Sequence, residues 1–433
     1  KFLTKIDFFN YSSSWWNGLL SILLVAVCAM ILSELFQIKH TGYAVLVGVL
    51  LISFPAMTSL FAYMFTAPYY MFAVLLMISA VYMTVKYSYG FLPAIIMMGF
   101  SMGIYQTYFG VATTLFVLIL VSDAETRNFI ENIKEAFKYL LTLLGGILCY
   151  FLGNTICIRN FHVTLLDYQG INDMADVTVK SLIGSVKNAY IGFLQPILGE
   201  FCGISNQKAV RILYLAVYLM VGVLVLRRLC KRGMELWNRI YFFVLCCLIP
   251  LSISIIYVMA VSDKTVIHTL MIYPYVFGLI YPIVLLEKRK SERKILEGIS
   301  VFYCTVAILL SIYYIRLDNI AYLKANYQQE TATAYYTEVI SQIKSTEKYN
   351  SNLPVLFMER QEAWMTRFQF CGGLMIFSCR DIVIICMILF HIMQVKNFWN
   401  YIVAILIRNL RIGRRLLQVK IFRRCLVIHA MVP

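Results

Sequence analysis

Three side chains in one short polar stretch have the types needed for acid–base chemistry or for holding a phosphate. Asp263, Lys264 and His268 lie within six residues of one another, between two apolar runs. A carboxylate can accept a proton from a hydroxyl group, and an ammonium group can bind a phosphate. We therefore predict Asp263 as a catalytic residue, and Lys264 and His268 as substrate-binding residues. A solvated turn is the alternative.

A further carboxylate lies close to the beginning of the sequence. Asp7 precedes the first apolar run, where it can act as a general base, and a solvated acid is the alternative. The sequence opens at Lys1 in the middle of a pattern, without an initiator Met or a signal peptide. We therefore expect a truncated N-terminus with a first span upstream.

Aromatic and amide side chains gather in two other segments. Tyr63 and Tyr69 lie in FAYMFTAPYY (61–70), and Tyr105 and Gln106 lie in GIYQTY (103–108). We predict all four as substrate-binding residues, because aromatic rings can form a wall for a sugar or a lipid phosphate. For the tyrosines the alternative is an aromatic belt at the membrane interface. For Gln106 it is a polar contact between helices, since an unpaired amide in hydrocarbon costs several kcal/mol.

The signatures of soluble enzymes are missing from the sequence. It holds no Walker A loop, no GxGxxG, no GxSxG and no HExxH motif. The 12 cysteines form no CxxC pair, and most of them lie in apolar runs, so we predict neither a metal site nor a disulfide framework. We expect no cofactor.

The composition indicates a membrane protein. Hydrophobic residues make up 61% of the chain and charged residues only 14%, which is too few to coat a soluble core. The net charge of +16 is concentrated in the tail, residues 360–433, and the rest of the chain is only mildly basic. This distribution disfavours nucleic acid as a partner and suits positively charged loops beside a lipid bilayer.

The apolar runs are long enough to cross a bilayer, which needs about 20 helical residues. Residues 91–122 are too long for one crossing, so we divide them near Tyr105. The result is an all-α polytopic membrane protein with about ten transmembrane helices. The predicted spans are 16–36, 43–64, 69–86, 90–104, 106–122, 137–156, 209–226, 240–260, 268–286 and 298–315.

Two strongly basic connections predict the orientation. Residues 227–239 and 288–294 are rich in Lys and Arg, and both are cytoplasmic by the positive-inside rule. Two spans separate them, so the two assignments agree. The turns at 65–68 and 262–267 and the loop 157–208 are then external, and we expect short surface helices in that loop.

The sequence divides into three parts. Residues 1–315 form the multi-span domain, and 316–360 form a small external α/β segment with a helix followed by a strand at Leu353–Phe357. Residues 361–433 form an atypical basic tail. This tail is either an eleventh span at 372–393 followed by a cytoplasmic end, or a non-native product of a shifted reading frame.

Several segments together resemble one family. They are NGLLSILLVAV (17–27), FPAMTSLFAYMFTAPYY (54–70), GFSMGIYQTYFG (99–110), SDKTVIHTLMIYPYV (262–276) and DNIAYLKANYQQETATAYYTEVISQI (318–343). Over about residues 1–358 the chain resembles the GtrII-type glucosyltransferases, bacterial membrane enzymes of the GT-C class.

The resemblance implies a polyprenyl-phosphate sugar as donor and a cell-surface polysaccharide as acceptor, at the outer side of the bacterial plasma membrane. It also implies an essential acid in the first external loop, of which only residues 1–14, with Asp7, are present. The acid that the family often has after YMFT is replaced here by Ala67–Pro68.

Two other interpretations stay open. A transporter or a lipid-linked sugar flippase would also be polytopic, although it should show internal repeats and charges at mid-membrane, which are scarce here. An inactive truncated product would explain the start and the tail of the sequence.

Overall fold

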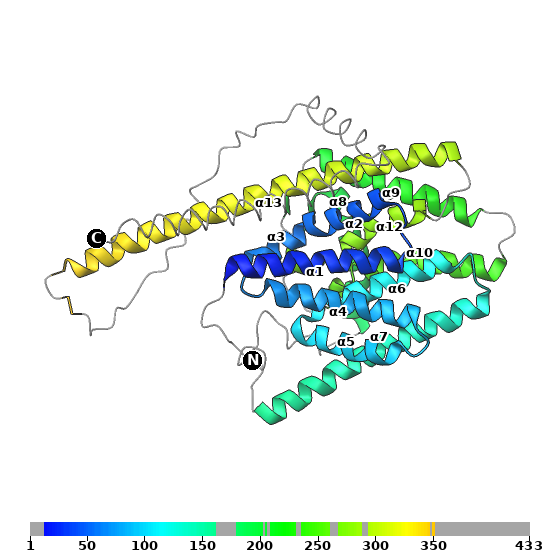
Figure 1. The fold of residues 1–433 in the computed structure, drawn as a ribbon, viewed down its shortest axis with the longest axis horizontal. Coiled ribbons are helices and arrows are strands. Elements are labelled where there is room, and N and C mark those ends of the chain that lie inside the picture. The colour runs from blue at the N-terminus through cyan, green and yellow to red at the C-terminus, as the bar shows by residue number, and fades with distance from the viewer. Residues whose placement is uncertain are drawn as a thin grey trace, which may run out of the picture. The chain divides into compact units, whose positions relative to one another are not determined.

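The computed structural model describes residues 13–161, 179–201, 204–205, 208–230, 235–259, 267–287, 293–346 and 349–350. The chain divides into two compact units, residues 1–367 and 368–433, and all described residues belong to the first. This unit is a bundle of helices (Figure 1). Its elements are α1 (Ser14–Leu35), α2 (Thr41–Ser53), α3 (Pro55–Ala62), α4 (Ala67–Lys86), α5 (Phe91–Ile104), η2 (Gln106–Tyr108), α6 (Phe109–Asp123), α7 (Phe129–Phe161), α8 (Val179–Leu198), β1 (Glu200–Phe201), β2 (Ile204–Ser205), α9 (Lys208–Leu229), α10 (Leu236–Ile253), α11 (Ile256–Met259), η4 (Thr269–Ile272), α12 (Tyr275–Glu287) and α13 (Arg293–Lys344).

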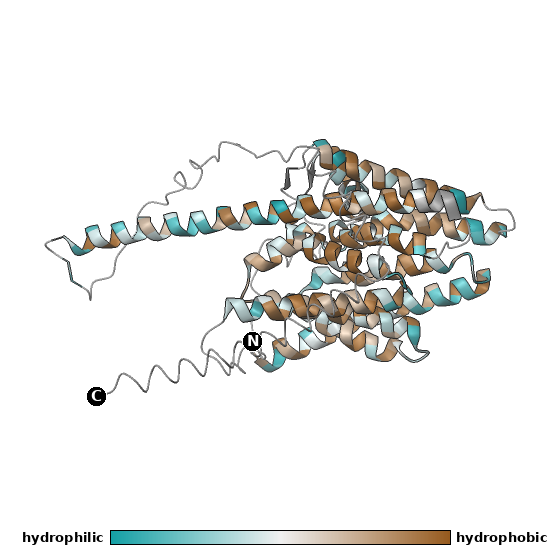
Figure 2. Cartoon of the chain, turned by 45° about the horizontal axis from the view of Figure 1, so that its top comes forward, coloured by the Kyte–Doolittle hydropathy of each residue, from teal (hydrophilic) through white to brown (hydrophobic). Residues whose placement is uncertain are grey.

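The predicted spans all have counterparts in the described residues. Eight helices are long and apolar enough to cross a membrane. The bent pair α2–α3 matches the predicted span 43–64, and the shorter apolar helix α5 matches 90–104. Figure 2 shows that hydrophobic residues predominate along the helices of the bundle. The predicted all-α polytopic membrane fold is therefore confirmed.

Two helices form the centre of the bundle. The most apolar windows of Gln106–Asp123 and Thr269–Glu287 are each 83% buried, whereas that of α7 is only 11% buried. Because the outer helices expose Leu, Ile and Phe side chains instead of charges, their outer faces suit lipid. Helices α6 and α12 are thus the interior against which the others pack.

Helices α5 and α7 approach each other through glycines. A Cβ atom at Gly145 would lie 2.6 Å from Ile95 Cδ1, and one at Gly146 would lie 2.8 Å from Met98 Cβ. Small residues allow helices to pack closely in lipid, where no hydrophobic force draws them together. These glycines therefore hold the long helix α7 against the bundle.

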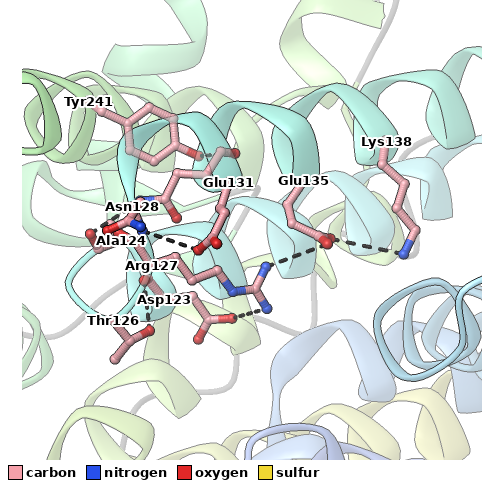
Figure 3. Close-up of polar contacts among 10 residues, drawn as sticks. Asp123, Ala124, Thr126, Arg127, Asn128, Glu131, Glu135, Lys138 and Tyr241 are labelled. Carbon is pink, nitrogen blue, oxygen red and sulfur yellow. Dashed lines mark hydrogen bonds and ion pairs between the residues drawn. The ribbon is translucent and has the colours of Figure 1, made fainter.

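The turn between α6 and α7 is fixed by charged side chains (Figure 3). Arg127 lies 3.2 Å from the Asp123 carboxylate and 3.7 Å from that of Glu135. At the start of α7, the Asn128 backbone N–H donates to Glu131 Oε2 at 3.3 Å, which satisfies a donor at the helix start. Through these ion pairs, Arg127 connects the end of α6 to the first turns of α7.

Further ion pairs lie at the same end of the bundle. Arg228, only 4% exposed, lies 3.5 Å from Glu125 Oε1, and Lys86 lies 3.1 Å from Glu34. We call the end that holds Lys86, Arg127 and Arg228 the basic end. The opposite end contains the α3–α4 turn, the α5–α6 break and η4. We call it the tyrosine-rich end, because Tyr63, Tyr69, Tyr70, Tyr105 and Tyr273 lie there.

Helix α13 differs from the prediction in its length. It runs unbroken over 52 residues, which corresponds to about 78 Å. The predicted span 298–315 and the predicted external helix after 315 are one element, which extends past the rest of the bundle (Figure 1). Its side chains from Asn319 onward are nearly all exposed. The predicted strand at Leu353–Phe357 lies outside the described residues, so the α/β character of this segment stays a prediction.

The loop predicted at 157–208 also contains more regular structure than expected. In the described part of this loop lies one helix of 20 residues, α8, followed by an antiparallel hairpin with two residues in each strand, β1–β2; residues 162–178 lie outside the described residues. Helix α8 packs on α9 and α10, where the Tyr190 hydroxyl donates to the Cys247 carbonyl at 2.8 Å and the Phe193 ring stacks on Tyr218. An amphipathic sequence explains this, because α8 has an apolar side to bury.

The buried ion pair at the basic end provides a test of this packing. We expect Glu125→Gln to lower the free energy of unfolding by about 3 kcal/mol, because it leaves the Arg228 charge buried without a counter-charge. Denaturant titration in detergent micelles measures this value. Glu131→Gln, at an exposed position of α7, is the control and should have little effect, because the amide oxygen of Gln can still accept from the Asn128 N–H. Equal stability of the two variants would contradict the assignment.

Candidate functional site

Interruptions of the helices gather at the tyrosine-rich end. Phe54 has extended backbone angles before Pro55, and α2 and α3 meet there at 49°. Tyr105 is extended between α5 and η2, and α10 ends at Ser254 before the short helix α11. Irregular backbone within a membrane domain is tolerated where it is buried in protein or lines a cavity. The arrangement therefore marks this end as the place for a site.

Side-chain hydroxyl groups form hydrogen bonds at these interruptions. The Thr114 hydroxyl on α6 donates to the Ser252 carbonyl at 3.0 Å, close to the end of α10. The Ser254 hydroxyl lies 2.7 Å from the Tyr275 hydroxyl at the start of α12. These bonds connect three interrupted elements, so the site rests on a fixed scaffold.

A row of aromatic rings lines this scaffold. The ring of Tyr105 lies 5.1 Å from that of Tyr70 and 5.1 Å from that of Tyr108, which in turn lies 6.4 Å from Tyr273. We call Tyr70, Tyr105, Tyr108 and Tyr273 the tyrosine cluster. Tyr108 and Tyr273 are buried, whereas Tyr70 and Tyr105 are half-buried. The cluster therefore runs from the interior of the bundle toward its surface.

A carboxylic acid meets this end from helix α13. The Thr58 hydroxyl on α3 donates to Asp318, and the Tyr322 hydroxyl donates to the Thr58 carbonyl at 3.4 Å. Asp318 lies three residues beyond the predicted span 298–315. Burial raises the pKa of this carboxyl to about 6, although the hydrogen bond from Thr58 opposes the shift. Burial likewise raises the pKa of Tyr322. The Asp318 carboxyl is therefore mostly ionised at neutral pH and becomes protonated as the pH falls through about 6.

The predicted tyrosines lie at this end with different degrees of exposure. Tyr63 and Tyr69 flank the α3–α4 turn and are 54% and 40% exposed, whereas Tyr105 belongs to the tyrosine cluster. Gln106 follows Tyr105 directly in η2, and its amide donates to the Tyr150 hydroxyl on α7. That bond is the helix-to-helix contact considered as the alternative for Gln106.

The remaining predicted site residues are only partly described. His268 is exposed and stands directly before η4, where its carbonyl accepts from the Met271 N–H at 2.9 Å. Asp7, Asp263 and Lys264 lie outside the described residues. Their predicted roles, catalytic for the two acids and substrate-binding for Lys264, stay predictions.

Sequence reasoning missed Asp318, Thr58 and Tyr322. One local signal was present, since Asp318 is an acid within one turn of the end of an apolar span. Its partner Thr58 is 260 positions away in the sequence, and no spacing pattern predicts such a contact.

Comparison with known families identifies the chain. The model of the family described as glucosyl transferase GtrII matches residues 1–286, well over half of the sequence. The chain belongs to the GtrII glucosyltransferase family. No curated protein and no solved structure is a significant match.

The GtrII match ends at α12. It therefore covers the tyrosine cluster, Thr58, and the predicted residues from Asp7 to His268, but not α13. Within this GtrII glucosyltransferase, the Thr58–Asp318 hydrogen bond joins the matched region to the helix that follows it. The site thus combines residues from both parts.

The raised pKa of Asp318 predicts how this carboxyl affects stability. Its folded-state pKa, about 6, exceeds the ordinary value of 3.8, so ionisation destabilises the fold as pH rises from about 4 to 6. Asp318→Asn should therefore raise the thermal unfolding midpoint by about 2 °C at pH 7.5, and by less at pH 4.5. The matched control is Glu338→Gln, on the exposed part of the same helix. A gain that does not depend on pH would contradict the assignment.

Proposed function

We propose that this GtrII-family glucosyltransferase moves glucose from a polyprenyl-phosphate donor to a cell-surface polysaccharide, at its tyrosine-rich end. Membership of the family supports glucosyl transfer. The apolar helices support a multi-pass membrane setting. One observation carries the choice of site: the half-buried Asp318 carboxyl accepts from Thr58 on α3, which packs on η4 directly before Tyr273 of the tyrosine cluster.

The proposed orientation rests on the basic end. Arg127 and Arg228 lie at this end, and the Lys/Arg-rich connections 227–239 and 288–294 adjoin it in sequence. The positive-inside rule assigns such connections to the cytoplasm. The tyrosine-rich end then faces the outside of a bacterial plasma membrane, where a surface polysaccharide is accessible.

The proposed reaction needs one proton acceptor. Asp318, as carboxylate, takes the proton from an acceptor hydroxyl, and the hydroxyl oxygen forms a bond to C1 of glucose. The bond between C1 and the phosphate oxygen breaks, and its electron pair leaves with the polyprenyl phosphate. A pKa of about 6 suits a base that works near neutral pH. Asp7 and Asp263, predicted as catalytic from the sequence, are the competing proton acceptors.

Cations at the same end suit the leaving phosphate. Lys264 and His268, predicted as substrate-binding, belong to the segment that precedes η4. Arg211 lies one turn before Tyr214, whose hydroxyl contacts that of Tyr314 on α13. A guanidinium group can bind a phosphate through two parallel hydrogen bonds. We propose that Arg211 and Lys264 bind the phosphate, and that Tyr63, Tyr69 and Tyr105 line the path of the sugar.

A transport function is not favoured by the described residues. Their buried charged side chains are Arg228 and Glu287, and both lie at the basic end. Transporters place ionisable groups near the bilayer midplane, where the substrate passes.

Donor choice tests the proposal directly. Purified protein in proteoliposomes should transfer radiolabelled glucose from polyprenyl-phosphate glucose to bacterial O-polysaccharide, and should not use UDP-glucose. Radioactivity in the precipitated polysaccharide measures transfer, and empty liposomes are the control. Transfer from UDP-glucose but not from the lipid donor would contradict the proposed donor.

The base assignment predicts a kinetic and pH signature. Asp318→Asn should lower kcat by about a hundredfold or more with little change in KM for the lipid donor, because it removes the proton acceptor and no contact to the donor. In the unchanged protein, kcat/KM should rise with pH through about 6, since the carboxyl must be ionised to act. Asp7→Asn and Asp263→Asn are measured beside it. If either of these abolishes transfer while Asp318→Asn does not, the base is that residue and not Asp318.

A further inference from the structure

The part of α13 beyond the bundle is a long exposed helix without an assigned role. From Asn319 to Lys344 it adds 26 residues to the helix, or about 39 Å. Polar and apolar residues are mixed along it, and Figure 2 shows hydrophilic positions over this stretch. Keeping so long an exposed segment helical costs conformational entropy that no packing against the bundle offsets. A binding partner would supply the missing contacts.

One face of this helix is continuous with the candidate site. Asp318, Tyr322, Gln329, Thr333 and Tyr336 follow one another at intervals of four, seven, four and three residues, which places them on one side of an α-helix. We call these five residues the Asp318 face. The Thr58 contacts of Asp318 and Tyr322 fix its direction, toward α3 and the tyrosine-rich end. Gln329, Thr333 and Tyr336 continue this direction outside the bundle, where they are exposed.

The side chains of this face suit an uncharged, hydroxyl-rich ligand. Gln329 offers an amide donor and acceptor, and the Thr333 hydroxyl, which donates to the Gln329 carbonyl at 2.8 Å, still accepts. Tyr336 offers a flat ring with a polar tip. Sugars present both C–H faces and hydroxyl groups, which match rings and amides respectively.

The charges along the extension are balanced. Lys324, Glu330, Glu338 and Lys344 are its ionisable Lys, Arg, Asp and Glu residues, two of each sign. A surface for nucleic acid or for an anionic lipid would carry an excess of cations. Neutrality therefore favours an uncharged partner.

We propose that the Asp318 face binds the neutral polysaccharide acceptor and leads it to the site at the tyrosine-rich end. This inference rests on the proposed function and names the surface that holds its acceptor. The acceptor lies along the exposed helix, with the hydroxyl to be glucosylated directed toward Asp318.

A second copy of the chain is the competing occupant of this helix. Ile320, Leu323 and Tyr327 form an apolar stripe on nearly the opposite side of the helix, at the spacing of a helix-pairing seam. The stripe is followed by Thr331, Ala334 and Glu338 and so does not continue as a seam. A pair of helices would also turn this stripe inward and leave the Asp318 face outside.

The chain offers residues of the same types on another face as a matched control. Gln328, Thr331 and Tyr335 lie about 130° around the helix from Gln329, Thr333 and Tyr336, and all six are exposed. The triple variant Gln329→Ala/Thr333→Ala/Tyr336→Ala should raise KM for O-polysaccharide about tenfold or more, without changing KM for the lipid donor. The triple variant Gln328→Ala/Thr331→Ala/Tyr335→Ala should leave both values unchanged.

A binding measurement without donor separates this inference from the proposed function. Immobilised full-length protein should retain neutral bacterial O-polysaccharide better than anionic polygalacturonate, and only the Asp318-face variant should lose retention. Transfer with an unchanged acceptor KM in both variants overturns the inference and leaves the proposed function intact. If the unchanged protein transfers no glucose, the proposed function fails, and polysaccharide retention alone tests the binding surface. Loss of retention that is confined to the Asp318-face variant then supports the surface. Equal retention by both variants overturns it. A change in copies per micelle in that variant, measured by light scattering, would show self-association and overturn it as well.

Discussion

The hydrogen-bonding needs of the backbone in lipid constrain this structure more than any other interaction. A helix satisfies its own peptide groups, so the apolar runs are helical throughout the described bundle. The interruptions at the tyrosine-rich end must find substitute partners. Hydroxyl groups such as that of Thr114 supply them there. A candidate site of irregular backbone and convergent polar groups is the result at this end.

The sequence was sufficient for the spans because length and hydropathy are local properties. Even the division of residues 91–122 was correct, and the break falls at Tyr105 between α5 and η2. The continuity of α13 was not predictable in the same way. The composition changes sharply after Ile315, which suggests a boundary, yet good helix formers on both sides let the helix continue.

For the candidate site too, the sequence indicates which residue types could take part, whereas contacts between distant positions depend on the fold. The sequence points to Tyr63, Tyr69 and Tyr105 because aromatic residues near span ends are conspicuous, and their substrate-binding role stays a prediction. Gln106 is predicted from its polarity, and in the fold its amide donates to the Tyr150 hydroxyl on α7. The Thr58–Asp318 contact needed the fold, since it depends on how α3 bends away from α2 after Pro55. Side-chain type thus predicts which residues are candidates, and tertiary packing decides which of them meet.

The unbroken course of α13 also has a mechanical consequence. A continuous helix transmits rotation, because bending it would break backbone hydrogen bonds. Its anchored half lies among the spans and its other half extends about 39 Å beyond them. A tilt of about 5° within the bilayer would displace the far tip by roughly 3 Å. Small changes in membrane thickness that tilt α13 would therefore move its far end by about the length of a hydrogen bond.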